Sequence, residues 1–196
     1  MTRMKRFYVG ASFLVVLTAG VLWTRRPMHA QTATPDEPYY TFPMDDVVMG
    51  YKIAPVQLTI GNRNPFRVGW GSYLVNAVGG CNDCHTNPPY ADGGDPYRGQ
   101  PKKVPAALYL GGGQAFGPFI SRNLTPEANG MPSGLTLDQF TEVLQKGTDF
   151  DKKHTQISPL LQVMPWPVYQ NMNPRQIRAI YEYLSSIPPV TVQGLP

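Results

Sequence analysis

The sequence is poor in cysteine, in histidine and in charged side chains. Its 196 residues include only two cysteines and three histidines, and Asp, Glu, Lys and Arg together make up 15%. Two cysteines are too few for a small secreted scaffold held by several disulfides. A structural zinc site is also disfavoured, because it needs a third and a fourth ligand and only His154 remains after His85.

An excess of basic charge is also missing from most of the chain. The formal net charge is +4, but five of the 17 basic residues lie in positions 1–30, where there is no acidic residue. The remaining 12 basic residues are matched by 13 acidic ones. The chain therefore lacks the basic footprint of a protein that binds nucleic acid, and we expect no nucleic-acid partner.

Residues 1–30 have the order of a secretory signal, with basic residues first, an apolar run at 7–23 and the small residue Ala30 at the end. The run is near the lower limit for a membrane span, which takes about 17–25 residues. Arg25 and Arg26 directly after it suit an uncleaved anchor, so a cleaved signal and an inner-membrane anchor both stay open. In either case, we expect the rest of the chain in the periplasm.

Proline and glycine, by contrast, are abundant. The 21 prolines and 19 glycines predict a few helices joined by long loops. Residues 31–65 contain five prolines and no sustained helical period, so we predict a Pro-rich tail that runs extended over the surface. The main domain is expected at residues 66–190, followed by a short C-terminal tail at 191–196.

Three segments of the main domain combine helical periodicity with recognisable end signals. The predicted helices span residues 68–78, residues 137–146, and Pro174 to Ser185 or Ser186. Their end signals are the N-caps Thr136 and Asn173 and the terminating glycines Gly79, Gly80 and Gly147. Their apolar stripes are Trp70, Leu74, Ala77 and Val78; Leu137, Phe140 and Leu144; and Ile177, Ile180, Tyr181 and Leu184.

Both cysteines belong to the pentapeptide Cys81-Asn82-Asp83-Cys84-His85, directly after the first predicted helix. Thiols three positions apart can reach the two vinyl groups on one side of a porphyrin, and the adjacent imidazole can then approach the iron. The spacing C-x-x-C-H is typical of covalent c-type haem attachment. We therefore predict one haem c, bonded to Cys81 and Cys84, with His85 as an axial iron ligand. A redox-active dithiol is the main alternative, although it usually follows a strand rather than a helix.

An electron carrier needs a second axial ligand, and ligation by His and Met raises the potential of the iron. The candidate side chains are Met44, Met49, Met131, His154, Met164 and Met172. Met164 is favoured because it stands in Val163-Met164-Pro165-Trp166-Pro167, where the prolines stiffen the loop that presents its thioether. His154 comes second, because it lies in a polar stretch that is typical of a surface.

Further pieces of the sequence resemble the class I cytochrome c family, in particular the bacterial mono-haem domains found as subunits of membrane-bound dehydrogenases. Besides the haem motif, the similar pieces are Gly71-Ser72-Tyr73-Leu74-Val75, Gly117-Pro118-Phe119, Ser121-Arg122-Asn123-Leu124-Thr125-Pro126, residues 137–147, Met164-Pro165-Trp166 and Ile180-Tyr181-Glu182-Tyr183-Leu184. The resemblance implies an all-α class I cytochrome c fold, with few helices and long loops wrapped around one covalently bound haem. It also implies that the first and last helices cross at Gly71 and that Met164 binds the iron.

In such relatives the Asn-Leu-Thr-Pro segment borders the haem, which makes Arg122, Asn123 and Thr125 candidates for its propionate side. A role for these residues in shaping a turn stays equally open. The expected function is transfer of single electrons between iron(III) and iron(II), from a dehydrogenase to an oxidase or another cytochrome. The chain would act as a free carrier or as a subunit of a larger complex, and not as an enzyme. A haem peroxidase or a gas-binding haem sensor is the alternative, and it requires a labile distal ligand.

Overall fold

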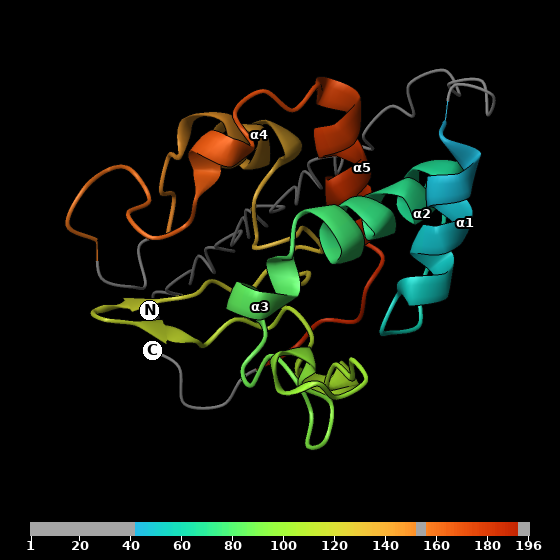
Figure 1. Ribbon diagram of the computed structural model, residues 1–196. Coiled ribbons are helices and arrows are strands. Elements are labelled where there is room, and N and C mark those ends of the chain that lie inside the picture. The colour runs from blue at the N-terminus through green and yellow to red at the C-terminus, as the bar shows by residue number, and fades with distance from the viewer. Residues whose placement is uncertain (1–41, 152–155, 192–196) are drawn as a thin grey trace, which may run out of the picture. The chain divides into compact units, whose positions relative to one another are not determined.

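The computed structural model describes residues 42–151 and 156–191 (Figure 1). The predicted signal or anchor at 1–30, residues 31–41, His154 and residues 192–196 lie outside them. Within the described part, no helix combines the length and the apolar character that a membrane span needs. All described residues belong to the same unit, Asp36–Pro196.

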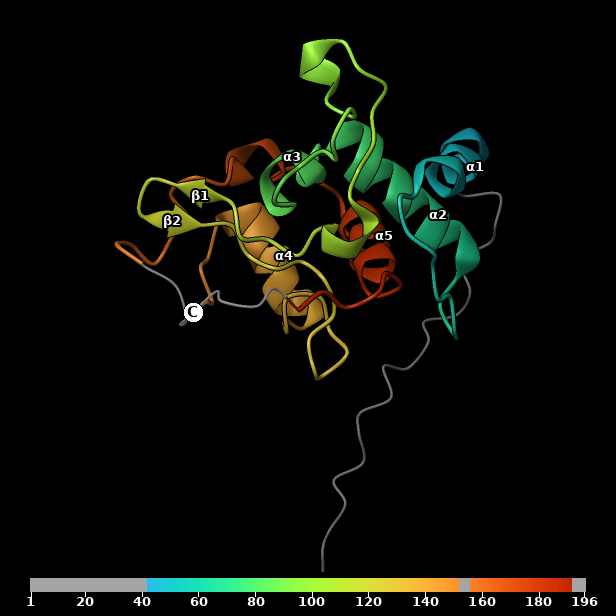
Figure 2. The same ribbon diagram turned by 90° about the horizontal axis from the view of Figure 1, so that it is seen from below.

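The fold class is confirmed in its coarse form, because the regular structure is mostly helical, with few helices and long loops between them. A small sheet was not predicted. Its strands β1 (Ala115–Phe116) and β2 (Phe119–Ile120) pair antiparallel around a two-residue loop, Gly117 and Pro118. Gly117 has a φ of +61°, which suits the first position of a tight hairpin turn. Figures 1 and 2 both show this hairpin far from helix α1.

The helix predicted over 68–78 begins earlier and changes character before it ends. Helix α2 (Pro65–Tyr73) starts at Asn64, whose side chain caps the first amides, and continues into a π-helical turn, Leu74–Val78. A π turn has more residues per turn than an α-helix, so it rotates the following side chains away from the predicted stripe. Val78, predicted on the apolar face, is therefore 59% exposed. Ala77 is exposed as well, and Val75 is buried in their place.

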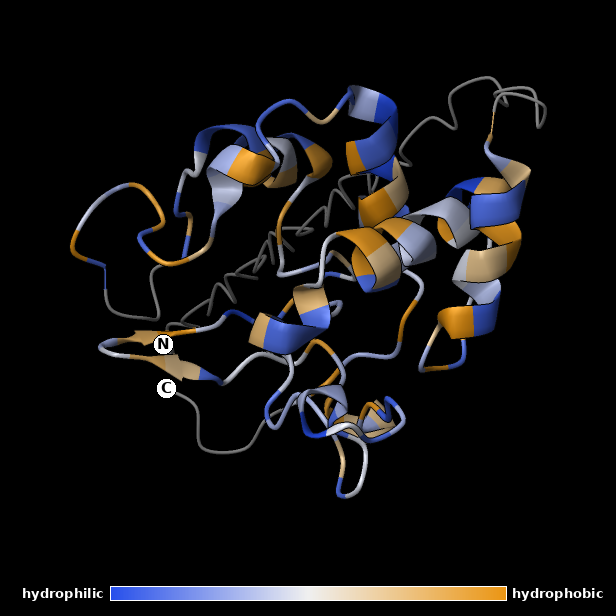
Figure 3. Ribbon diagram, viewed as in Figure 1, coloured by the Kyte–Doolittle hydropathy of each residue, from blue (hydrophilic) through white to orange (hydrophobic). Residues whose placement is uncertain are grey.

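Helix α5 (Pro174–Leu184) confirms the third predicted helix, and Asn173 forms a capping box with Gln176 at its start. It packs against α2 in the centre of the core. A Cβ atom placed on Gly71 would lie 1.9 Å from the carbonyl oxygen of Ala179, so only glycine permits this approach. Figure 3 shows that both α2 and α5 carry hydrophobic as well as hydrophilic residues.

The extended tail predicted for residues 31–65 is wrong at residues 44–53, because helix α1 (Met44–Ile53) lies within it. Pro43 precedes the helix and Pro55 follows it, so the prolines limit the helix instead of preventing it. Asp45 and Asp46 lie in its first turn, where negative charge interacts well with the helix dipole. The helix buries Val47 and Gly50 against α2.

Helix α4 (Leu137–Lys146) has the predicted bounds. Thr136 and Gln139 form a capping box at its start, and Gly147 ends it with a φ of +71°. Phe140 and Leu144 are buried in the core, as their stripe predicts. The helix presents these side chains to the interior from the side opposite its charged residues, because its apolar positions repeat with helical spacing.

Candidate functional site

The described residues surround a cavity of about 1100 Å³, slightly above the range of about 300–1,000 Å³ that is typical of ligand sites. One wall is the segment Gly79–His85, and another is the loop that follows α4. Apolar side chains from several elements complete the lining, among them Leu74, Phe116, Phe119, Phe140, Leu144 and Ile180. The cavity can therefore hold a large and mainly apolar group.

The pentapeptide forms a short helix, α3 (Cys81–His85), at the edge of this cavity. Gly80 has a left-handed φ of +59°, which separates α3 from the preceding π turn. Cys81 is half-buried, Cys84 is exposed, and the two are not joined by a disulfide. Residues three apart share one face of a helical turn, so both thiols border the cavity as the motif predicts.

The pKa values of both thiols lie above the ordinary value for cysteine. Burial, more than the nearby Cys84 and Asp83, raises the pKa of the Cys81 thiol to about 12. Burial and the Asp83 carboxylate also raise the pKa of the Cys84 thiol. Catalytic dithiols depend on a lowered pKa, because the thiolate is the reactive form. The arrangement therefore disfavours the dithiol interpretation.

His85 lies at the cavity with its ring orientation fixed. Its Nδ1 is 2.8 Å from the main-chain carbonyl oxygen of Arg122. A carbonyl can only accept a hydrogen bond, so Nδ1 carries the proton and Nε2 keeps its lone pair. Burial lowers the pKa of His85, while the bond to the Arg122 carbonyl acts in the opposite direction. A neutral imidazole with Nδ1 bound to a carbonyl is the usual state of a metal-ligating histidine.

Two methionines of the described chain line the cavity, Met164 and Met172. Met164 is partly buried against the core, and its carbonyl accepts a hydrogen bond from the Trp166 amide at 2.8 Å. With Pro165 at φ −78° and ψ 53°, this contact makes an inverse γ-turn, which the proline ring stiffens. The structure thus places the predicted ligand at the cavity and adds Met172, a less favoured candidate, beside it.

The three candidates for a propionate side differ in what their side chains contact. Asn123 accepts hydrogen bonds from the amide and the hydroxyl of Thr125, and it donates to the carbonyl of Val190. Thr125 is fully buried, and its hydroxyl accepts a bond from the Val190 amide. These contacts support the turn-shaping role for both residues. Their predicted contact with propionates stays a prediction.

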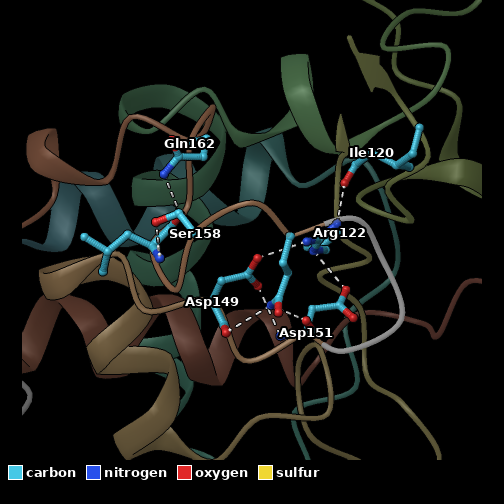
Figure 4. A network of polar contacts seen from close by, with 8 residues as sticks. Ile120, Arg122, Asp149, Asp151, Ser158 and Gln162 are labelled. Carbon is cyan, nitrogen blue, oxygen red and sulfur yellow. Dashed lines mark hydrogen bonds and ion pairs between the residues drawn. The ribbon is translucent and has the colours of Figure 1, made fainter. Parts of the chain in front are cut away.

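The Arg122 side chain takes part in a polar network that sequence reasoning missed (Figure 4). Its Nη2 lies 3.1 Å from Asp149 Oδ2, its Nε lies 2.9 Å from Asp151 Oδ2, and its Nη1 donates to the Ile120 carbonyl. The side chains of Arg122 and Asp149 are only 18% and 8% exposed. No local pattern predicts these pairs, because the partners lie 27 or more residues apart and meet only in the fold.

The residues present fit a covalently attached haem. Two thiols on one helical turn could attach it, a neutral imidazole and a thioether could bind its iron, and apolar side chains line the space between them. Within residues 42–151 and 156–191, no group of three or more His, Cys, Asp or Glu side chains could hold a metal ion by itself. No family model, no curated protein and no solved structure matches the chain.

Proposed function

We propose that this protein is a mono-haem c-type cytochrome with a class I cytochrome c fold, which carries single electrons in the periplasm. One observation carries the proposal: Cys81, Cys84, His85 and Met164 all border the same large apolar cavity. The close crossing of α2 and α5 at Gly71 supports the fold, because the family resemblance implies this contact.

When bound, the haem supplies an iron that gains and loses one electron. The chain contributes the attachment and the surroundings. The Cys81 and Cys84 thiols would hold the haem through covalent bonds, and the Nε2 lone pair of His85 and the thioether of Met164 would bind its iron. With both residues bound, the iron would have no site left for a substrate. The apolar lining excludes water, which favours a raised potential.

Electron exchange with a partner requires an accessible edge. Cys84 is exposed, whereas Cys81 is half-buried, so the attachment side nearest Cys84 is the accessible one. Interfaces of electron-transfer complexes are small, below about 1,200 Å² in total, and do not require a large apolar patch. We propose a dehydrogenase as donor and an oxidase or another cytochrome as acceptor. The protein would act as a free carrier or as a subunit of their complex.

The test is to express the full chain with haem-maturation machinery and to record absorption spectra with and without carbon monoxide. Sharp low-spin bands, a weak red-end band of sulfur ligation in the ferric protein and no response to carbon monoxide are expected. Met164→Ala should lose the sulfur band, while the matched Met172→Ala should keep it. A high-spin spectrum that changes with carbon monoxide would favour a sensor or peroxidase. Protein without covalent haem would refute the proposal.

A further inference from the structure

Arg122 contacts both sides of the candidate haem site through different parts of the same residue. Its main-chain carbonyl accepts the bond from His85 Nδ1 at 2.8 Å. Its guanidinium reaches Asp149 and Asp151, which follow the end of α4. The Ile120 carbonyl accepts a further bond from Nη1 at 2.9 Å, which holds the side chain against the end of β2.

The segment that Arg122 holds is connected to Met164 through a short antiparallel pairing. The Asp149 amide donates to the Pro159 carbonyl at 2.9 Å, and the Leu161 amide donates to the Gly147 carbonyl at 2.8 Å. Thr148 and Leu160 form the bridge between them. The paired strand ends only a few residues before Met164. A shift of Asp149 is therefore transmitted to the residues that present the thioether.

The main chain of Arg122 packs tightly against Gly112 on the histidine side. A Cβ atom on Gly112 would lie 2.6 Å from the carbonyl carbon of Arg122, and the Gly112 amide donates to the His85 carbonyl at 2.7 Å. Gly112 and Arg122 thus pack backbone to backbone next to the imidazole. Because this contact positions the Arg122 main chain beside His85, the Arg122 side chain can hold the segment with Asp149 and Asp151 at a defined place relative to His85.

We propose that Arg122 is a positioning residue that fixes the Met164 segment relative to His85. The carbonyl orients the imidazole, and the guanidinium anchors the loop that carries the thioether. Both carboxylates are largely shielded from water, with 8% and 20% of the Asp149 and Asp151 side chains exposed. Loss of the guanidinium would break both ion pairs and the bond to the Ile120 carbonyl, so the loop would no longer be held against the end of β2. This inference rests on the proposed function.

The test uses the haem-loaded protein and three variants. Arg122→Ala removes the guanidinium, and the double variant Asp149→Asn and Asp151→Asn removes the two charges that it binds. Arg122→Lys keeps the positive charge but lacks the planar, forked donor geometry of the guanidinium. Arg98→Ala is the matched control, because Arg98 also forms an ion pair, with Asp95, but its side chain is 79% exposed. The main-chain bond to His85 persists in every variant, so the comparison isolates the side chain.

Arg122→Ala and the double variant should show a weaker sulfur-ligation band and should bind carbon monoxide. The population with an open iron should rise by about tenfold or more, and tenfold corresponds to about 1.4 kcal/mol of lost anchoring. Arg122→Lys should restore part of the band, and Arg98→Ala should match the wild type. Amide exchange in residues 147–151 and 156–164 should rise in the same two variants, which detects a released segment independently of the spectrum.

The failure of this inference is distinguishable from failure of the proposed function. If the wild type is low-spin and both Arg122→Ala and the double variant keep its spectrum and its amide exchange, Arg122 does not position the ligand, and the cytochrome assignment stands. If Arg122→Ala does not mature, the double variant decides alone, because it preserves the arginine and nearly the same side-chain volumes. Wild-type protein without haem would overturn both proposals.

Discussion

The Tyr169 hydroxyl donates a hydrogen bond to the main-chain carbonyl of Gly79 at 3.0 Å, although 90 residues separate them in the sequence. Both residues line the cavity. Gly79 lies just before the attachment helix α3, and Tyr169 lies just after the turn that follows Met164. This bond is thus a second connection between the two walls, independent of the ion pairs of Arg122.

Replacing Tyr169 with phenylalanine should lower the free energy of unfolding of the haem-loaded protein by about 1 kcal/mol, because it removes one part-buried hydrogen bond. Urea denaturation followed by the haem absorption measures this difference. Tyr97→Phe is the control, since Tyr97 is 81% exposed and its hydroxyl contact with Asp83 is long, at 3.3 Å. Equal effects of the two substitutions would contradict the importance of the Tyr169 contact.

Two glycines on α2 allow a matched test of the helix crossing. A Cβ on Gly71 would come closest to the main chain of Ala179, whereas the atoms closest to a Cβ on Gly69 would belong to the side chains of Tyr51 and Val47. Main chain cannot rotate away, so Gly71→Ala should separate α2 from α5 and cost about 3 kcal/mol or more. Gly69→Ala should cost less, because the partly exposed Tyr51 can swing aside. Thermal unfolding of both variants checks the order, and a larger loss for Gly69→Ala would refute it.

A closed ring of hydrogen bonds lies behind the site, formed by Asn76, Tyr109 and Tyr183. The Tyr109 hydroxyl donates to Asn76 Oδ1 at 2.6 Å, and Asn76 Nδ2 donates to the Tyr183 hydroxyl at 3.1 Å. The two hydroxyls lie 2.9 Å apart, so Tyr183 donates to Tyr109 and completes the ring. Each residue of the ring therefore both donates and accepts.

Tyr109→Phe and Tyr183→Phe should each lower the free energy of unfolding by about 1–3 kcal/mol, since each leaves buried polar groups without a partner. The double variant should cost less than the sum, with a coupling of about 0.5–3 kcal/mol, because the orphaned hydroxyl is removed as well. A double-mutant cycle by urea denaturation measures the coupling. Strict additivity would show that the two hydroxyls act separately.

Gly147 combines a left-handed backbone with a crowded position. Its φ is +71°, and a Cβ there would lie 2.4 Å from Nε1 of the Trp166 indole. Gly147→Ala should therefore cost more than the roughly 1–2 kcal/mol of left-handed strain alone, and it should weaken the sulfur-ligation band by pushing Trp166 away. Gly130 has a φ of +73°, and a Cβ atom there would have no atom within 4 Å. Gly130→Ala therefore introduces the left-handed strain without the clash. The sulfur-ligation band should be unchanged in Gly130→Ala. A similar weakening of this band in both variants would contradict the argument.

The features that the sequence predicted well are those with local signals. Helix α4 has its predicted bounds because Thr136 and Gly147 mark its ends and Phe140 and Leu144 mark its inner face. Helix α1 was missed because the prolines near both of its ends favoured an extended chain, although the ten residues between them can form a helix. Its burial against α2 depends on Gly50 and Gly69, whose backbones meet only in the folded chain.

At the candidate site, too, features with local signals were predicted, and contacts between distant segments were not. The pentapeptide and the proline-stiffened turn at Met164 are local, and the structure brings both to the cavity. The approach of Met172 to that cavity was not predicted, because it follows from the path of the chain into α5. The pairing of Arg122 with Asp149 and Asp151 was missed for a similar reason. Acidic residues in a loop give no sign of their partner before the fold is known.

The π-helical turn at Leu74–Val78 fixes the direction in which the attachment motif faces. The amide of Gly79 bonds to the carbonyl of Leu74, at 2.7 Å, and so encloses one residue more than a regular α-helical turn. Each residue of an α-helix advances the chain by about 100° around its axis. A chain shorter by one residue here would keep α2 in the core but would rotate Cys81 and His85 by roughly that angle. The register between core and motif therefore depends on the length of this turn.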